Sequence, residues 1–169
     1  ILLFTLGYKL NAINKSTGAI AWSKDLSSSN SYLPIYVAEG KTLVYTSDNK
    51  YTLVNLGTGA DIWKISSADK LMSFAISGDN IYALTDSARI NVLRLSDGQL
   101  MKQSDQLQTQ SLNYNGNAFQ NAMIVADTAI ILNTNLKVIA VGKSSFTPIW
   151  SVNKNHSKLE LGSAATIMQ

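Results

Sequence analysis

The side chains that could carry out chemistry are few in this sequence. The only histidine, His156, lies in the polar stretch 153–158, and cysteine is absent. A lone exposed histidine forms neither a metal site nor a catalytic pair, because both need partner groups. Without cysteine, the chain has no disulfide, no thiolate metal ligand and no cysteine nucleophile. We therefore expect no metal site and no catalytic residue.

The acidic residues are distributed singly along the chain, in predicted turns or at strand ends. They are Asp25, Glu39, Asp48, Asp61, Asp69, Asp79, Asp86, Asp97, Asp105, Asp127 and Glu160. No two of them have a spacing that commits them to shared acid–base work. The Asp97-Gly98 and Asn115-Gly116 pairs and the run 77–82 are typical of hairpin turns, and no helix follows them as a phosphate loop requires. We expect no cofactor.

Charge and hydropathy exclude other classes of protein. The net charge is +3, from 14 Lys and Arg against 11 Asp and Glu, and the basic residues are scattered. No basic stripe could follow a phosphate backbone, so we expect no nucleic-acid partner. No apolar run reaches the 18 residues of a membrane span. Residues 1–4 resemble a strand joined midway and not a signal peptide, so we expect the chain to be a piece of a longer protein.

A turn glycine recurs along the chain at intervals of 41 and 39 residues. The three glycines are Gly18, Gly59 and Gly98, each between two short runs of alternating apolar residues. A tryptophan stands four residues after the first two glycines, at Trp22 and Trp63. This self-similarity predicts a repeat of about 40 residues.

The other two copies of the repeat are less regular. Lys102 holds the tryptophan position in the third copy. A fourth copy spans 136–152 and is closed by Trp150, but its turn glycine is missing. A second kind of hairpin precedes the last three copies, at 33–49, 71–87 and 121–135.

Two hairpins in each repeat make four antiparallel strands, which is the signature of a β-propeller blade. We therefore predict an all-β fold, a propeller fragment of about four four-stranded antiparallel blades. The predicted repeats are 1–26, 33–67, 71–105 and 121–153, with 154–169 beginning a further strand or blade. Four copies of this repeat type are too few to close a ring, so the expected shape is an open arc that the rest of its own propeller, or another copy of the chain, would complete.

The glycine and the tryptophan have distinct expected roles. The glycines permit the positive φ that a tight hairpin needs. The tryptophans offer a large flat surface with which one blade packs against the next. We therefore predict that Trp22, Trp63, Trp150, Gly18, Gly59 and Gly98 are structural blade-docking residues.

The segment 104–122 departs from the repeat and contains about eight extra residues. Its apolar side chains are Leu107, Leu112, Tyr114 and Phe119. Loops on the rims of propellers are free to carry function. The segment either packs onto its own blade or contacts a partner protein, and the sequence leaves both open.

The stretches 10–22 and 51–63 resemble the repeat of quinoprotein-type (PQQ-like) propellers, in which a turn glycine is followed four residues later by tryptophan. The resemblance covers essentially the whole chain and implies a fold more than a function. Quinoprotein dehydrogenases hold their quinone under a vicinal-cysteine disulfide and use a catalytic aspartate beside calcium ligands. This sequence has no cysteine and no acidic residue in a recognisable motif, so we do not expect an enzyme.

Two non-catalytic groups share this repeat. Segments 90–103, 125–149 and 158–168 are similar to the lumenal propeller of subunit 1 of the endoplasmic-reticulum membrane protein complex, which we place slightly ahead. Segment 74–105 also resembles a blade of the BamB-type lipoprotein of bacterial outer-membrane assembly. Both resemblances imply a scaffold that contacts other subunits of a membrane-protein insertion or assembly complex, in the endoplasmic-reticulum lumen or in the periplasm. The sequons at Asn14 and Asn155 fit a lumenal location without supporting it.

Overall fold

The computed structural model describes residues 1–26, 35, 37–46, 48–107, 123–133 and 137–153, and this part of the chain forms fourteen β-strands. The strands are β1 (Leu2–Leu6), β2 (Lys9–Ile13), β3 (Ile20–Asp25), β4 (Lys41–Thr46), β5 (Lys50–Asn55), β6 (Asp61–Ser66), β7 (Leu71–Ser77), β8 (Asn80–Thr85), β9 (Ile90–Arg94), β10 (Leu100–Gln103), β11 (Ile124–Val125), β12 (Ala129–Asn133), β13 (Lys137–Gly142) and β14 (Pro148–Asn153). None of the described residues forms a helix long and apolar enough to cross a membrane.

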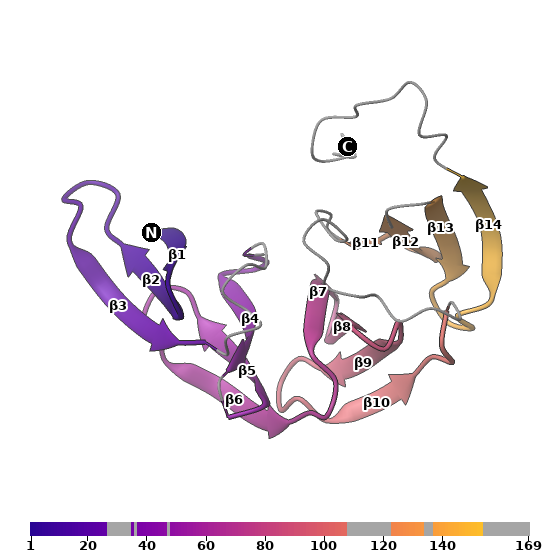
Figure 1. Ribbon diagram of the computed structural model, residues 1–169, viewed down its shortest axis with the longest axis horizontal. Helices are drawn as coiled ribbons and strands as arrows, with labels where there is room; N and C mark the ends of the chain where they lie inside the picture. The colour runs from indigo at the N-terminus through magenta and orange to yellow at the C-terminus, as the bar shows by residue number, and fades with distance from the viewer. Residues whose placement is uncertain (27–34, 36, 47, 108–122, 134–136, 154–169) are drawn as a thin grey trace.

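The strands form four antiparallel sheets that follow one another along an open arc (Figure 1). We call them blade 1 (β1–β3), blade 2 (β4–β6), blade 3 (β7–β10) and blade 4 (β11–β14). Within each blade, neighbours in sequence are neighbours in the sheet. The last strand of each blade, β3, β6, β10 or β14, lies on the outside of the arc (Figure 1). The all-β partial propeller predicted from the repeat is confirmed.

Blades 3 and 4 have four strands each, whereas blades 1 and 2 have three among the described residues. The turn glycines show which strands correspond, because the strands that flank Gly18, Gly59 and Gly98 are the last two of their blades. Strand β1 therefore corresponds to β4, β8 and β12. The first strand predicted in the hairpin 33–49 falls mainly on residues 33, 34 and 36, which lie outside the described residues.

Strands in the middle of the arc are buried on both faces. In β8, Ile81 and Ala83 pack in a cluster with blade 2, and Tyr82 and Leu84 pack in a cluster with blade 4. A strand covered on both sides is apolar throughout and does not alternate with polar residues. The sequence of β8 has this property because successive side chains point to opposite faces and each face meets a neighbouring blade.

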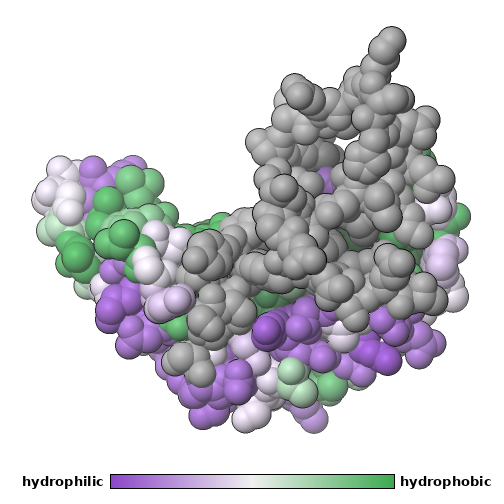
Figure 2. Space-filling model, in the orientation of Figure 1, coloured by the Kyte–Doolittle hydropathy of each residue, from purple (hydrophilic) through white to green (hydrophobic). Residues whose placement is uncertain are grey.

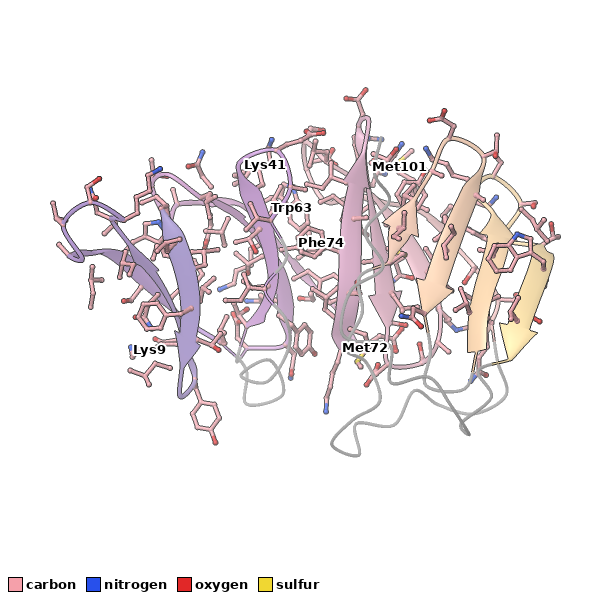
Figure 3. The ribbon with its side chains drawn as sticks, turned by 90° about the horizontal axis from the view of Figure 1, so that it is seen from above. Lys9, Lys41, Trp63, Met72, Phe74 and Met101 are labelled. Atoms are coloured by element: carbon pink, nitrogen blue, oxygen red, sulfur yellow. The ribbon has the colours of Figure 1, made fainter. Side chains whose placement is uncertain are left out.

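The hydrophobic core is divided among the spaces between blades. One cluster, which includes Leu10 and Val54, joins blades 1 and 2. A second joins blades 2 and 3, and Figure 3 shows Trp63 and Phe74 between these two sheets. A third joins blades 3 and 4 and includes Tyr82 and Ile139. Each blade thus depends on its neighbours for burial, as in other repeat architectures.

Candidate functional site

The junction between blades 1 and 2 is fastened by Trp22 of β3. Its indole Nε1 donates a hydrogen bond to the main-chain oxygen of Leu56, at 3.0 Å. The ring lies against Gly59 of the β5–β6 turn, where a Cβ atom would be 2.5 Å from Trp22 Cγ. Gly59 also has a φ of +72°, which side chains rarely adopt. Glycine is therefore required here both by the backbone and by the tryptophan of the preceding blade.

The junction between blades 2 and 3 repeats this arrangement. Trp63 of β6 donates from Nε1 to the main-chain oxygen of Leu95, at 2.8 Å. A Cβ atom on Gly98, which has a φ of +75°, would be 2.8 Å from Trp63 Cε3. The spacing of glycine and tryptophan along the sequence therefore corresponds to contacts in space: the tryptophan of one repeat meets the glycine of the next.

The junction between blades 3 and 4 uses different residues at the same positions. Lys102 occupies the tryptophan position, and its Nζ donates to the main-chain oxygen of Ser144. The ammonium group also lies 4.8 Å from the centre of the Phe146 ring, which makes a cation–π contact. Phe146 occupies the glycine position with a φ of +61°. At this junction the bulky aromatic ring therefore belongs to the turn of the following blade. At the first two junctions it belongs to the outer strand of the preceding blade.

The main-chain hydrogen bonds show that the Phe146 turn is equivalent to the glycine turns. Phe146 donates its main-chain N–H to the oxygen four residues earlier, at 2.8 Å, as Gly59 and Gly98 do at 2.8 and 2.9 Å. Lys143, in the same turn, donates to Ser77 Oγ of blade 3 at 2.9 Å and lies over the ring of Tyr82. Side chains thus preserve the junction where glycine and tryptophan are absent.

A second pair of positions contributes to the first junction, two residues beyond the tryptophan and two beyond the glycine. At the first junction these are Lys24 and Asp61, which form an ion pair between blades. At the second they are Ile65 and Leu100, both apolar. Sequence reasoning missed these pairs, because they become visible only after one repeat is stacked on the next.

Gly18 and Trp150 lie at the two ends of the arc. Nothing lies within 4 Å of a Cβ atom placed on Gly18, although its φ is +72°. The side chain of Trp150, on β14, is 46% exposed. Among the predicted blade-docking residues, the structure pairs Trp22 with Gly59 and Trp63 with Gly98. Within the described part of the chain, it places neither Gly18 nor Trp150 at a junction.

Of the four apolar residues of the candidate partner loop, only Leu107 is described. Leu107 packs partly against the core cluster of blades 3 and 4, and its main-chain N–H donates to the oxygen of Ala88 at 2.9 Å. The beginning of the loop therefore lies on its own blade. Leu112, Tyr114 and Phe119 lie outside the described residues, as does His156.

Two carboxylates among the described residues, Asp48 and Asp97, have a lowered pKa and partners in or beside turns. Asp48 accepts a hydrogen bond from Thr46 at 2.5 Å and lies 3.1 Å from Lys50 Nζ and 3.2 Å from Lys64 Nζ. These three groups lower the pKa of the Asp48 carboxyl, with the Thr46 hydroxyl contributing most. Asp97 accepts the main-chain N–H of Gln99 and the Arg94 guanidinium, which lower its pKa in the same way. Both carboxylates are held ionised and serve the turns.

Burial, and not a catalytic partner, accounts for the perturbed tyrosines. The pKa of Tyr51 is raised chiefly by burial. Its hydroxyl donates to the main-chain oxygen of Asp69 at 2.9 Å. Within the residues that the structure describes, no group of three or more His, Asp or Glu side chains could hold a metal ion.

The repeat geometry agrees with a known protein family. The family described as "Outer membrane protein assembly factor BamB" matches residues 1–166, nearly the whole chain. The chain belongs to this family. No curated protein matches the sequence significantly.

Solved structures show the same propeller architecture. BamB from Moraxella catarrhalis superposes with a TM-score of 0.60 at 19% identity, over 89% of this chain and 47% of that protein. The WD40 domain of Neurospora crassa Pan2 gives a TM-score of 0.59 at 14% identity, over 89% and 48% of the two chains. Quinohemoprotein alcohol dehydrogenase from Comamonas testosteroni gives 0.51 at 14% identity, over 72% and 20%. The chain spans about half the length of the first two, and identities this low show the fold alone.

Proposed function

We propose that the chain is a non-catalytic scaffold that binds protein partners in the assembly of outer-membrane proteins, on the periplasmic side of the outer membrane. The match of the BamB family over residues 1–166 carries this proposal. The function follows from shape: stacked blades hold two rims of turns in fixed positions, and a partner binds those turns without any bond being made or broken.

The chemistry of the described side chains supports a scaffold. The charged groups with shifted pKa values, Asp48 and Asp97, cap turns or join neighbouring strands. The tryptophans at the first two junctions are used for packing, each with its indole N–H already donated to a main-chain oxygen. These groups have partners within the fold, which is what a rigid support for loops requires.

The endoplasmic-reticulum complex is the other setting in which such a scaffold would act. The sequence resemblances to its subunit 1 are piecemeal, whereas the BamB family covers the chain from end to end. We therefore favour assembly of outer-membrane proteins over insertion at the endoplasmic reticulum. In both settings the expected partners are other subunits of a membrane-protein assembly complex.

Site-specific photo-crosslinking in the bacterial periplasm tests the proposal. A photoreactive residue would replace Ser96, in the β9–β10 turn of one rim, or Tyr8, in the β1–β2 turn of the other. The host would lack its own BamB. We expect crosslinks from at least one rim to a protein of the outer-membrane assembly machinery, and improved assembly of outer-membrane β-barrels.

The control places the same residue at Leu53, which is fully buried between blades. A folded periplasmic chain that gives no crosslink to the machinery from either rim, and leaves barrel assembly unimproved, would contradict the proposal. Addition of a quinone with calcium provides a separate check on enzyme function. We expect no new absorption band and no increase in thermal midpoint.

A further inference from the structure

The hairpin that joins β9 to β10 differs from its counterparts at one turn position. In blades 1 and 2, Asn14 and Asn55 stand four residues before the turn glycine, and each side-chain oxygen accepts two main-chain N–H groups of the turn. In blade 3 this position holds Arg94, and Asp97 accepts the turn N–H of Gln99 at 3.0 Å. Arginine has no acceptor, so Arg94 cannot bind the turn as asparagine does. Its guanidinium is therefore available to other side chains.

The guanidinium of Arg94 has two side-chain partners on the same hairpin. Nη1 donates to Asp97 Oδ2 at 2.8 Å, and Nη2 donates to the sulfur atom of Met101 at 3.3 Å. Met101 stands three residues after the turn glycine, at a position where the other blades carry alanine or isoleucine. Those side chains have no acceptor. The two residues by which this hairpin departs from the others therefore contact each other and form one site.

Among the methionines that the structure describes, Met101 is the one that faces water. Met101 is 52% exposed, whereas Met72 and Met123 are 2% and 4% exposed and belong to the core cluster of blades 3 and 4. Met101 and Met72 lie near opposite rims (Figure 3). Hydrophilic residues predominate along the outer side of blades 2 and 3 (Figure 2). Blades 2 and 4 are described on either side of β10, so this exposure is not that of an end blade.

We propose that Met101 is a site of reversible oxidation, at which a peroxide converts the thioether to a sulfoxide and the Arg94 guanidinium binds the sulfoxide oxygen. A sulfur lone pair attacks one peroxide oxygen, so that an S–O bond forms and the O–O bond breaks. The sulfur loses two electrons and the peroxide gains them. The proton of the transferred hydroxyl passes to the departing hydroxide, which leaves as water. A methionine sulfoxide reductase, with a thiol as reductant, reverses the change.

The sulfoxide oxygen is a better partner for Arg94 than the thioether sulfur. A thioether is a weak acceptor, whereas a sulfoxide is polar, and hydrogen bonds from a charged donor are the stronger kind. Oxidation of the exposed Met101 adds no polar group to the core. Oxidation of Met72 or Met123 would place a polar oxygen between blades 3 and 4, where it would disrupt packing. The position of oxidation therefore decides whether the fold is weakened.

Timed treatment of the folded protein with hydrogen peroxide, followed by mass spectrometry of its peptides, tests the site. We expect Met101 to be oxidised at least about tenfold faster than Met72 and Met123, because the buried sulfurs react only after local opening. A methionine sulfoxide reductase with a thiol reductant should restore the original mass. Oxidation of Met101 no faster than that of the two buried methionines, or a sulfoxide that the reductase leaves unchanged in the folded protein, would overturn the proposal.

Urea midpoints before and after oxidation test the contact with Arg94. We expect oxidation of Met101 to raise the midpoint in the original chain and in Asp97→Asn, which keeps Arg94, but not in Arg94→Ala. These measurements use chains with Met168→Leu, because Met168 lies outside the described residues. The same change of midpoint with and without Arg94 would show that the guanidinium does not bind the sulfoxide, and would refute that part of the proposal.

Ile62→Met/Met101→Leu is the matched control, because it moves the thioether to blade 2. Ile62 stands at the position of Met101 and is 40% exposed, but the residue four before its turn glycine is Asn55. We expect the introduced methionine to be oxidised readily, because it is exposed, without a rise in the urea midpoint, because asparagine takes the place of Arg94. An equal rise in this variant would show that oxidation stabilises any exposed hairpin, and would contradict the role of Arg94.

Discussion

At Gly59, one residue meets two separate structural demands. The turn requires a φ of +72°, and the ring of Trp22 occupies the space into which a Cβ atom would project. Each demand alone favours glycine, and together they make substitution costly. Gly78 meets only the first demand, since its φ is +57° and nothing lies within 4 Å of a Cβ atom. The two glycines therefore separate backbone strain from contact between blades.

We expect Gly59→Ala to lower the free energy of unfolding by about 3 kcal/mol, because strain and overpacking act together. Gly78→Ala should lower it by about 1 kcal/mol, from strain alone. Urea unfolding followed by circular dichroism measures both values. Equal losses at the two positions would show that the Trp22 contact contributes nothing.

The hydrogen bonds of the indole groups can be tested separately from the packing of the rings. Trp63→Phe retains an aromatic ring but removes the donor to Leu95 O. We expect a loss of about 1 to 2 kcal/mol in unfolding free energy, part of it from the unpaired carbonyl group. Urea unfolding of this variant, beside Tyr8→Phe as an exposed control, gives the value. A loss no larger than that of the control would contradict the role given to the hydrogen bond.

Asp48 makes stability depend on acidity. Its pKa is lowered in the folded protein, so the folded state binds this proton less readily than the unfolded chain does. The carboxylate therefore stabilises the fold above the ordinary aspartate pKa of about 4, and this contribution is lost as the pH falls toward the lower folded value. We expect the urea midpoint of Asp48→Asn to fall less between pH 6 and pH 2.5 than that of the original chain. Asp79→Asn, in an exposed turn, serves as control. If the urea midpoint of Asp48→Asn falls between pH 6 and pH 2.5 as much as that of the original chain, the prediction is refuted.

Among the strands and turns, blade 4 shows how geometry persists while residues change. The hydrogen-bonded turn that receives Trp22 at Gly59 is rebuilt around Phe146, and Lys102 fills the place of the tryptophan. Tryptophan at position 102 would meet the Phe146 ring, and glycine at 146 would leave Lys102 without its aromatic partner. Tryptophan fits against glycine, and Lys102 fits against Phe146. A junction that combines one residue of each pair should therefore be less stable.

A double-mutant cycle tests this matching. Lys102→Trp alone should cost about 1 to 3 kcal/mol through overpacking, and Phe146→Gly about 3 to 5 kcal/mol through lost burial. The double variant, which recreates the junction of blades 1 and 2, should recover at least about 1 kcal/mol of the summed loss. Lys102→Trp with Leu100→Ala is the control cycle, because Leu100 faces the other neighbouring blade. Additive losses in both cycles would show that the residues act independently.

The repeat, the turns and the all-β class could be predicted from sequence because they depend on local spacing. Gly18 and Trp22 lie on one hairpin, and the pattern repeats in blade 2. The contacts that join blades could not be predicted in the same way. Lys24 and Asp61 are 37 residues apart. At the third junction, Lys102 and Phe146 stand in place of tryptophan and glycine, so neither residue type of the repeat is retained. One signal was present, since Phe146 stands four residues before Trp150, as Gly18 stands before Trp22.

On the scale of the whole molecule, the blades are stacked in one direction, and the hydrophobic core lies in the junctions between them. Burial is concentrated between neighbours, so an end blade is covered on one face only. The apolar residues Leu2, Phe4, Leu6 and Val152 remain on the outer faces.

The direction of the tryptophan–glycine contact also bears on how such a gene can grow. Blade 2 accepts a tryptophan at Gly59 and presents Trp63 to the next blade. Two tandem copies of blade 2 would therefore form this same contact with each other. Blade 3 accepts a tryptophan at Gly98 but presents Lys102 to the next blade. In two tandem copies of blade 3, this lysine would meet a glycine turn that has no aromatic ring. Duplication of blade 2 would thus preserve the junction, whereas duplication of blade 3 would not. The exchange at Lys102 and Phe146 fixes the position of blade 4 in the order of the repeats.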